Sequence, residues 1–222
     1  YLFISHSASL DFPLPYPRMS PGKLVLIIGP SGVGKSVILK TLRSRHPEFV
    51  FPRSATTRAR REREGDDLYH FVSEEEFTDW INQEKFLEWA QVHKGARYGT
   101  LYDEIIPAIE QGKTVVREVD VQGFESLRKD TRYFGDGAKY KLQTIFILPE
   151  NEQQLIARII KRAPIADEEL KRRIESMQKE LAFAALTDVQ IINREGKIEE
   201  TIKEVERAIG DTNYELRITN YE

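Results

Sequence analysis

The sequence contains no cysteine, which excludes disulfide bonds and thiolate chemistry and favours a reducing compartment, so we expect a cytoplasmic protein. It also has no apolar run near the roughly 20 residues that a membrane-spanning helix needs, and we expect no membrane partner. Neither sign of charge dominates, because 33 basic and 36 acidic side chains leave a net charge of −3. This balance provides no long-range field to attract nucleic acid, so we expect no nucleic-acid partner.

Residues 1–20 include several prolines but neither an early basic region nor a small-residue cleavage site. They fit a signal peptide poorly, and we expect a poorly ordered or loosely docked extension. Residues 211–222 are expected to be a C-terminal tail. The remaining residues 21–210 are enough for one domain with subdomains.

The most specific signal is the segment GPSGVGKS, which satisfies the phosphate-binding loop pattern G-x-x-x-x-G-K-[ST] at every fixed position. It consists of Gly29, Pro30, Ser31, Gly32, Val33, Gly34, Lys35 and Ser36. An apolar run at Lys23–Ile28 predicts a buried strand before it, and apolar residues at helical spacing over 37–42 predict a helix after it. Backbone N–H groups then converge on phosphates, Lys35 reaches the outer phosphates, and the Ser36 hydroxyl can bind Mg²⁺. The sequence therefore predicts binding of a nucleoside triphosphate with Mg²⁺.

Apolar runs and helical patterns alternate along the rest of the chain. Further core strands are predicted at 114–119, 144–148 and 189–192, and another strand at 85–92. Helices are predicted after a capping box at Ser73 and Glu76, and over 101–111, 123–129, 152–161, 167–186 and 198–209. This alternation predicts an α/β fold with a parallel sheet covered by helices on both faces, and a ligand at the carboxyl ends of the strands.

Several charged side chains could serve such a site. Arg58 and Arg61 carry guanidinium forks that match phosphate oxygens, although a run of arginines is also typical of a solvated face or an RNA-binding patch. Glu88 lies in an apolar segment, where it is either an exposed strand position or a ligand. Glu118 and Asp120 stand two apart at a strand end, which suits a Mg²⁺-bound water, the acceptor nucleotide or plain solvent.

Eight motifs, in order over residues 22–210, resemble those of guanylate kinase: GPSGVGKS at Gly29, SATTRARR at Ser54, YHFVSEEEF at Tyr69, FLEWAQV at Phe86, YGT at Tyr98, EVDVQG at Glu118, FILP at Phe146 and IIN at Ile191. The resemblance implies phosphoryl transfer from ATP to GMP, giving ADP and GDP. It also implies a P-loop kinase fold with three parts: a core (21–52, 113–157 and 174–210), an inserted GMP-binding subdomain (53–112) and a small helical lid (158–173).

The resemblance also implies roles for individual residues. Arg58, Arg61, Tyr69 and Tyr98 would hold the acceptor phosphate, and Ser54, Glu88 and Thr100 would surround guanine. Asp120 would organise the region around this strand end, contact guanine or bind Mg²⁺ through a water molecule. Which of these roles belongs to Asp120 and which to Glu118 stays open. Arg158, Arg162 and Arg173 would close on the transferring phosphoryl group, and Asn193 would lie near the adenine end of ATP.

The proposed reading of guanine by Glu88 has a chemical basis. Guanine presents N1–H and N2–H₂ side by side, and one carboxylate can accept from both. Adenine has an acceptor at N1 and lacks both donors, so a buried Glu88 would reject it through unpaired groups.

Three alternatives to a guanylate kinase remain at this point: a non-catalytic interaction module with the same fold, a kinase for another acceptor such as a phosphorylated ribose, and nucleic-acid binding through residues 53–63. One departure from the family pattern concerns the lid, where Ala163 and Pro164 follow Arg162 in place of Gly-Thr. Loss of the glycine and gain of a proline should stiffen that hinge. The sequence leaves the oligomeric state open.

Overall fold

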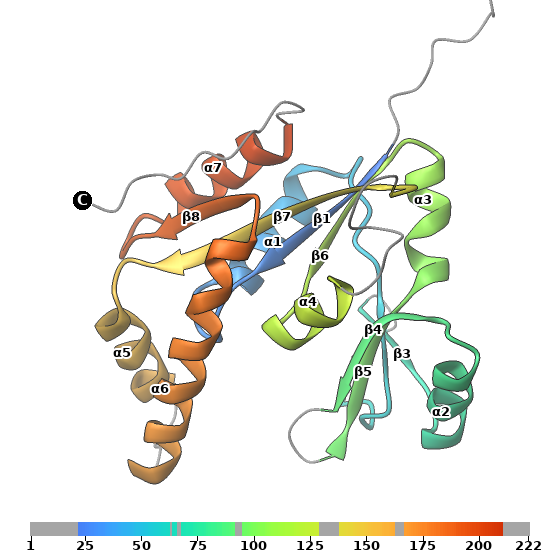
Figure 1. Cartoon of the computed structure of the whole chain (residues 1–222), viewed down its shortest axis with the longest axis horizontal. Helices are drawn as coiled ribbons and strands as arrows, with labels where there is room; N and C mark the ends of the chain where they lie inside the picture. Colours follow the sequence, from blue (N-terminus) through green and yellow to red (C-terminus); the bar gives the residue numbers. More distant parts are fainter. Residues whose placement is uncertain are drawn as a thin grey trace, which may run out of the picture.

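The computed structural model describes residues 22–62, 64–65, 68–91, 95–128, 138–162 and 167–210, which form two β-sheets with flanking helices (Figure 1). The main sheet is parallel, with the strand order β6-β1-β7-β8. Its strands are β1 (Lys23–Ile28), β6 (Thr114–Glu118), β7 (Lys141–Pro149) and β8 (Val189–Asn193). The expected parallel α/β sheet is therefore confirmed.

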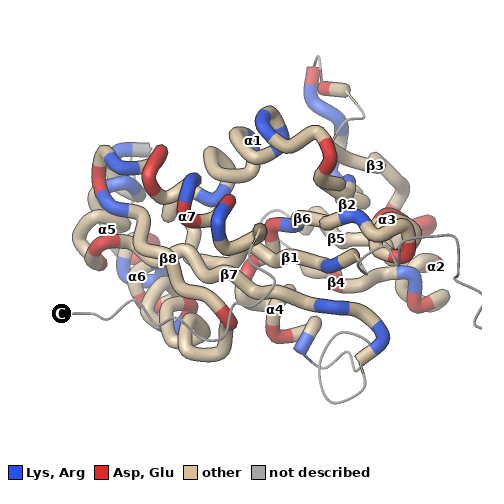
Figure 2. Tube along the Cα trace, turned by 90° about the horizontal axis from the view of Figure 1, so that it is seen from above, with Lys and Arg blue, Asp and Glu red and all other residues tan. Residues whose placement is uncertain are grey.

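The main sheet is buried on both faces, as the unbroken apolar run of β1 requires. Val25 and Ile27 pack toward α1 (Lys35–Arg45) and α7 (Ile198–Gly210). Leu24, Leu26 and Ile28 face the other way, toward α3 (Ile106–Glu110) and α4 (Val121–Leu127). Figure 2 shows α1 and α4 on opposite sides of the sheet. Because helices cover both faces of the main sheet, we expect the ligand site at the carboxyl ends of its strands.

A second, mixed sheet has the order β3-β2-β5-β4 and lies beside the carboxyl end of β6 (Figure 1). Its strands are β2 (Ser54–Thr56), β3 (Tyr69–Phe71), β4 (Phe86–Gln91) and β5 (Arg97–Leu101). One face packs against α2 (Glu74–Asn82) through an apolar cluster of Ala55, Phe77, Phe86 and Leu101. The Ser73 hydroxyl accepts from the Glu76 N–H, which confirms half of the predicted capping box. The other face of this sheet does not pack against α2.

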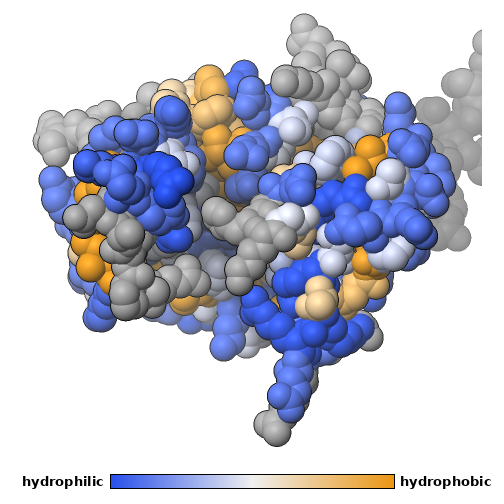
Figure 3. All heavy atoms as spheres, turned by 90° about the horizontal axis from the view of Figure 1, so that it is seen from below, coloured by the Kyte–Doolittle hydropathy of each residue, from blue (hydrophilic) through white to orange (hydrophobic). Residues whose placement is uncertain are grey.

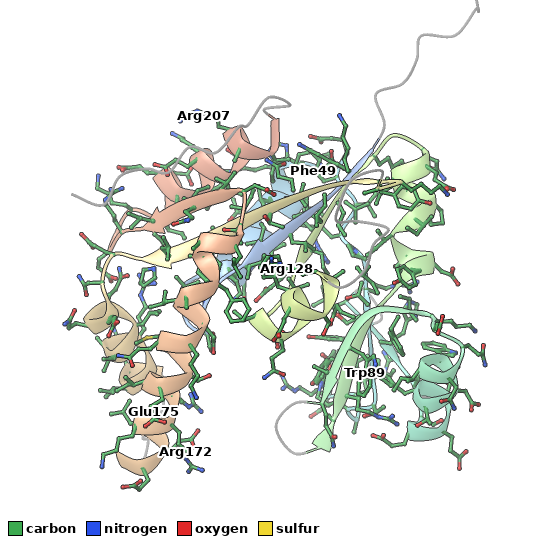
Figure 4. The ribbon with its side chains drawn as sticks, viewed as in Figure 1. Phe49, Trp89, Arg128, Arg172, Glu175 and Arg207 are labelled. Carbon is green, nitrogen blue, oxygen red and sulfur yellow. The ribbon has the colours of Figure 1, made fainter. Side chains whose placement is uncertain are left out.

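On the opposite side of the molecule lie α5 (Glu152–Arg162) and α6 (Asp167–Leu181), followed by a 3₁₀ helix at Ala182–Leu186 (Figure 1). The far end of α6 carries Arg172 and Glu175, which extend into solvent (Figure 4). The hinge expected at Ala163 and Pro164 lies outside the described residues, as do residues 1–20 and 211–222.

Some predicted elements were wrong in type or extent. Residues 101–111 are not one helix: β5 ends at Leu101, a 3₁₀ turn covers Tyr102–Glu104, and only Ile106–Glu110 is α-helical. Pro107 occupies the first turn of this short helix, where it costs no hydrogen bond. The helix predicted over 123–129 begins earlier, at Val121, because the Asp120 carboxylate accepts from the Gly123 N–H and caps it. The helix predicted over 167–186 turns 3₁₀ after residue 181.

No helix in the described part of the chain is long and apolar enough to cross a membrane. The face seen in Figure 3 is largely hydrophilic, with apolar side chains in small separate groups.

The contact between α1 and α7 makes stability depend on pH. His46 follows α1, stacks on Phe49, and contacts the carboxylates of Glu48 and of Glu206 in α7. Burial alone would lower the pKa of His46, but the two carboxylates outweigh it and raise that pKa. The protonated form is therefore favoured by folding, and this stabilisation is complete below about pH 6.5, the ordinary histidine value, and lost as the pH rises through the folded-state pKa.

We therefore expect His46→Gln to lower Tm most in acid and hardly at all at alkaline pH, with a free-energy difference of about 0.5 kcal/mol because the pair is near the surface. Thermal unfolding of both proteins between about pH 5.5 and 8.5 measures this. A Tm difference that is constant with pH would show that His46 acts only through stacking.

Candidate functional site

The phosphate-binding loop joins the end of β1 to the start of α1, as the motif predicts. Gly32 and Gly34 have φ angles of 85° and 112°, which favour glycine strongly. A Cβ on Gly34 would also lie 2.7 Å from the side-chain nitrogen of Asn193. The loop therefore depends on Gly34 both for its backbone conformation and for space.

Lys35 lies in the first turn of α1, and its side chain folds back over the loop. Its Nζ donates to the carbonyl oxygens of Gly29 (2.6 Å) and Pro30 (3.1 Å) and lies 3.8 Å from a carboxylate oxygen of Glu118. Burial lowers the pKa of Lys35, while the charge of Glu118 opposes this shift. The ammonium group is thus held at the loop beside the end of β6.

Asn193 supports the loop from behind. Its side-chain N–H₂ donates to the Val33 carbonyl (2.7 Å), its oxygen accepts from the Thr201 hydroxyl, and the residue is 2% exposed. The side chain of Asn193 therefore joins the loop to α7, and the predicted contact with adenine remains a prediction.

A cavity of about 410 Å³ opens above the loop. It is lined by Ser31, Gly32, Gly34, Lys35, Ser36, Val37, Glu118, Arg158 and Lys161. Arg158 reaches it from α5, donating to the Val33 carbonyl (3.3 Å) and to Glu195 (2.8 Å). Lys161, one helical turn from Arg158, was not identified from the sequence, since a lysine on an exposed helix carries no distinguishing signal.

The other two predicted lid arginines are not placed in this cavity. Arg162 ends α5, but its side chain lies outside the description. Arg173 lies on α6, where its side chain is 48% exposed and its Nε donates to the carboxylate of Glu169 one turn away (3.0 Å). The role predicted for each remains a prediction.

The predicted acceptor residues line up across the second sheet. Tyr69 pairs with Ser54, Ser54 with Thr100, and Thr100 with Glu88, each on the neighbouring strand. Residues paired in this way project to the same face, here the face opposite α2. Tyr98 lies two residues from Thr100 along β5 and shares that face, with its ring 6.1 Å from that of Tyr69. The structure therefore brings together residues from four separate segments.

A β-bulge directs Glu88 to this face. The pairing of β4 with β5 shifts between Phe86 and Glu88, so that Phe86 packs against α2 while Glu88 points away from it. Leu87, between them, is buried in the core of the main sheet. Glu88 is only 10% exposed, and one of its oxygens accepts from the Thr100 hydroxyl.

The Glu88 carboxylate also lies close to α4. A Cβ on Gly123 would stand 3.3 Å from an oxygen of Glu88 and 3.3 Å from an oxygen of Asp120. Gly123 therefore leaves room for two carboxylates side by side, Glu88 from the small sheet and Asp120 from the helix cap.

Arg58 follows β2 and lies over the rings of Tyr69 (5.2 Å) and Phe71 (5.4 Å). Its guanidinium holds the Glu64 carboxylate through two bonds of 2.9 and 2.7 Å. The backbone N–H of Arg61 donates to the same carboxylate (3.0 Å). These bonds, that from Arg58 first, lower the pKa of Glu64 to about 2. The Arg61 side chain is exposed.

A second cavity, of about 510 Å³, lies between α1, the small sheet and the end of β6. Its lining includes Ser54, Tyr69 and Arg117. It also includes Ser36 and Glu118, which line the cavity above the loop as well. The two cavities therefore meet at these two residues.

Comparisons with known proteins agree on one family. The family model described as guanylate kinase matches residues 21–212. The guanylate kinase of Thermosynechococcus vestitus is 40% identical over 191 residues, which cover 85% of this chain and 94% of that protein. The guanylate kinase of Nocardia farcinica is 39% identical over 176 residues, covering 78% and 87%. The crystal structure of guanylate kinase from Anaplasma phagocytophilum matches with a TM-score of 0.60 and 25% identity, covering 86% of each chain.

Proposed function

The chain belongs to the guanylate kinase family and is an ATP:GMP phosphotransferase, and from this activity we propose which residues in and beside the two adjoining cavities hold each substrate. The observation that supports the assignment best is that Ser36 and Glu118 line both cavities. A donor phosphate over the loop and an acceptor phosphate in the second cavity would then face each other across these two residues. In-line positioning of this kind is the main requirement of phosphoryl transfer, because the acceptor phosphate is already ionised.

The donor side belongs to the loop. Its backbone N–H groups and the start of α1 would bind the ATP phosphates, and Lys35 would neutralise charge on the transferring group. Arg158, whose guanidinium donates to the Val33 carbonyl, would add a second positive charge from α5. Arg162 and Arg173 would complete this set, and Asn193 would reach toward adenine.

The residues at the cavity junction fit Mg²⁺. This ion keeps several waters and binds through few protein oxygens together with substrate phosphates, so a hydroxyl and a carboxylate suffice. Ser36 and Glu118 supply them, and Asp120 would act through water. When bound with ATP, Mg²⁺ neutralises phosphate charge. A cluster of three or more acidic, histidine or cysteine ligands is absent from the described residues, and this mode of binding requires none.

The acceptor side belongs to the small sheet. Arg58, Arg61, Tyr69 and Tyr98 would bind the GMP phosphate, and Ser54, Thr100 and Glu88 would surround guanine. The common face of these strands supports this assignment. The division into core, GMP-binding subdomain and lid, and the cytoplasmic location, belong to the same proposal.

One assay tests the assignment of the acceptor. ADP release is measured with GMP, AMP, UMP and CMP at saturating ATP and Mg²⁺, in the wild type and in a Ser54→Ala, Thr100→Val double variant. GMP should be the preferred acceptor of the wild type, and the variant should lose that preference through a higher KM for GMP. An unchanged KM for GMP in the variant would show that these hydroxyls do not contact GMP.

Glu64 gives a further prediction, because its carboxylate occupies the Arg58 fork that we assign to the GMP phosphate. With a pKa of about 2 it is ionised at every pH used for assay, so the incoming phosphate has to displace it. We expect Glu64→Gln to lower the KM for GMP about fivefold, the size of an ion pair near the protein surface, with kcat little changed.

Initial rates at varied GMP measure this effect, and Glu62→Gln, which changes an exposed neighbour in the same way, is the matched control. A higher KM in Glu64→Gln would mean that Glu64 holds Arg58 in the binding geometry instead of competing with the phosphate.

A further inference from the structure

Arg117 is a charged side chain at a position of β6 that otherwise faces the core. Val115, two residues earlier on the same face, is buried against α3 and α4. The Arg117 side chain is 17% exposed, and its Nη2 lies 3.6 Å from an oxygen of Glu88, an ion-pair distance longer than a hydrogen bond. Its Nε is buried and has no hydrogen-bond partner. Burial of a charged side chain with an unpaired N–H lowers the free energy of unfolding, so we expect Arg117 to have a function that offsets this cost.

The Glu88 carboxylate needs the positive charge that Arg117 provides. A carboxylate that is 10% exposed needs a partner for its charge, and the Thr100 hydroxyl provides only a neutral hydrogen bond. The Asp120 carboxylate, which also lies next to Gly123, adds like-charge repulsion. The guanidinium of Arg117 offsets both effects and attracts the same oxygen that Thr100 binds.

The two partners come from different sheets. Glu88 lies on β4 of the small sheet, and Arg117 lies on β6 at the edge of the main sheet. Glu118, the next residue on β6, points to the opposite face, where it pairs with Lys35. The end of β6 therefore reaches both proposed substrate sites, the base-reading carboxylate through Arg117 and the phosphate loop through Glu118.

We propose that Arg117 is a positioning residue for guanine recognition: it balances the charge of the Glu88 carboxylate and holds one of its oxygens against Thr100, which leaves the other to accept from the base. The proposal rests on the assignment of guanine to Glu88. Arg117 acts through Glu88 and does not touch the reacting phosphates, so its loss should affect GMP binding and leave the chemical step intact.

The test compares Arg117→Gln, which removes the charge, with Arg117→Lys, which keeps it. We expect Arg117→Gln to raise the KM for GMP about tenfold, with kcat and the KM for ATP within about twofold of the wild type. Arg117→Lys should recover most of the lost affinity, because a single positive charge near Glu88 suffices.

Arg97 provides a matched control, because it is also part-buried (14% exposed side chain), also has a buried Nε without a hydrogen-bond partner, and lies on the α2 side of the small sheet. Arg97→Gln should lower Tm and leave the KM for GMP unchanged. An equal rise in KM in this control, or a wild-type KM in Arg117→Gln, overturns the proposal. So does a Lys variant no better than the Gln variant.

A double variant separates this proposal from the assignment on which it rests. If Glu88 reads guanine and Arg117 acts through it, Arg117→Gln should add no further rise in KM to Glu88→Gln. If Glu88→Gln alone has a wild-type KM, the assignment of guanine to Glu88 fails. If Glu88→Gln has a high KM and Arg117→Gln raises it further, only the role of Arg117 fails.

Discussion

Replacing Lys35 with methionine is expected to lower kcat for GMP phosphorylation about a thousandfold, because in our proposal the side chain supplies positive charge to the transferring phosphoryl group. Two loop carbonyls and Glu118 hold the ammonium group at the junction of the cavities. Methionine keeps the unbranched stem and removes the charge and its hydrogen bonds. The KM for GMP should change little, since we assign that substrate to the small sheet.

Steady-state ADP release measures this effect, and thermal unfolding shows whether the variant is folded. Lys203→Met, on the exposed surface of α7, is the control for loss of one positive charge. A Lys35→Met enzyme that retains more than about a tenth of kcat would mean that Mg²⁺ and the arginines carry the charge neutralisation without it.

The phosphate loop was predictable because its geometry is local. Eight consecutive residues fix the turn, and the apolar run before them can only be a buried strand. The four core strands were recognised for the same reason, as short apolar runs bounded by turns or helices. Asp120 was selected as a site residue, but its role as the cap of α4 depends on the helix start, which a pattern locates poorly.

The geometry of the small sheet depends on non-local features. Strict alternation over FLEWA would put Phe86 and Glu88 on one face, and the bulge at Leu87 separates them because Leu87 is drawn into the main core. Strand β5 was not predicted, since Arg97 and Gly99 interrupt its apolar pattern. Arg117 was missed although a charged residue inside an apolar strand is the same signal that drew attention to Glu88; its partner is 29 positions away in sequence.

Replacing Glu88 with glutamine is expected to lower kcat/KM for GMP about a thousandfold, while kcat/KM for AMP, which we expect to be low in the wild type, falls much less. The Thr100 hydroxyl binds one carboxylate oxygen, so the amide oxygen of glutamine should take that place. Its N–H₂ group then occupies the position of the other oxygen, next to Gly123 and facing the base. Guanine N1–H and N2–H₂ would meet a donor there, whereas adenine N1 would meet a group that it can accept from.

The measurement is kcat/KM for GMP and for AMP at saturating ATP, with the KM for ATP in parallel. Glu110→Gln removes a carboxylate that pairs with Lys139 at the surface, and it should behave as the wild type. A wild-type value for GMP would show that Glu88 does not contact the base. An equal loss for GMP and AMP would show that Glu88 only stabilises the small sheet, because discrimination requires that the lost contact be worth more to one purine than to the other.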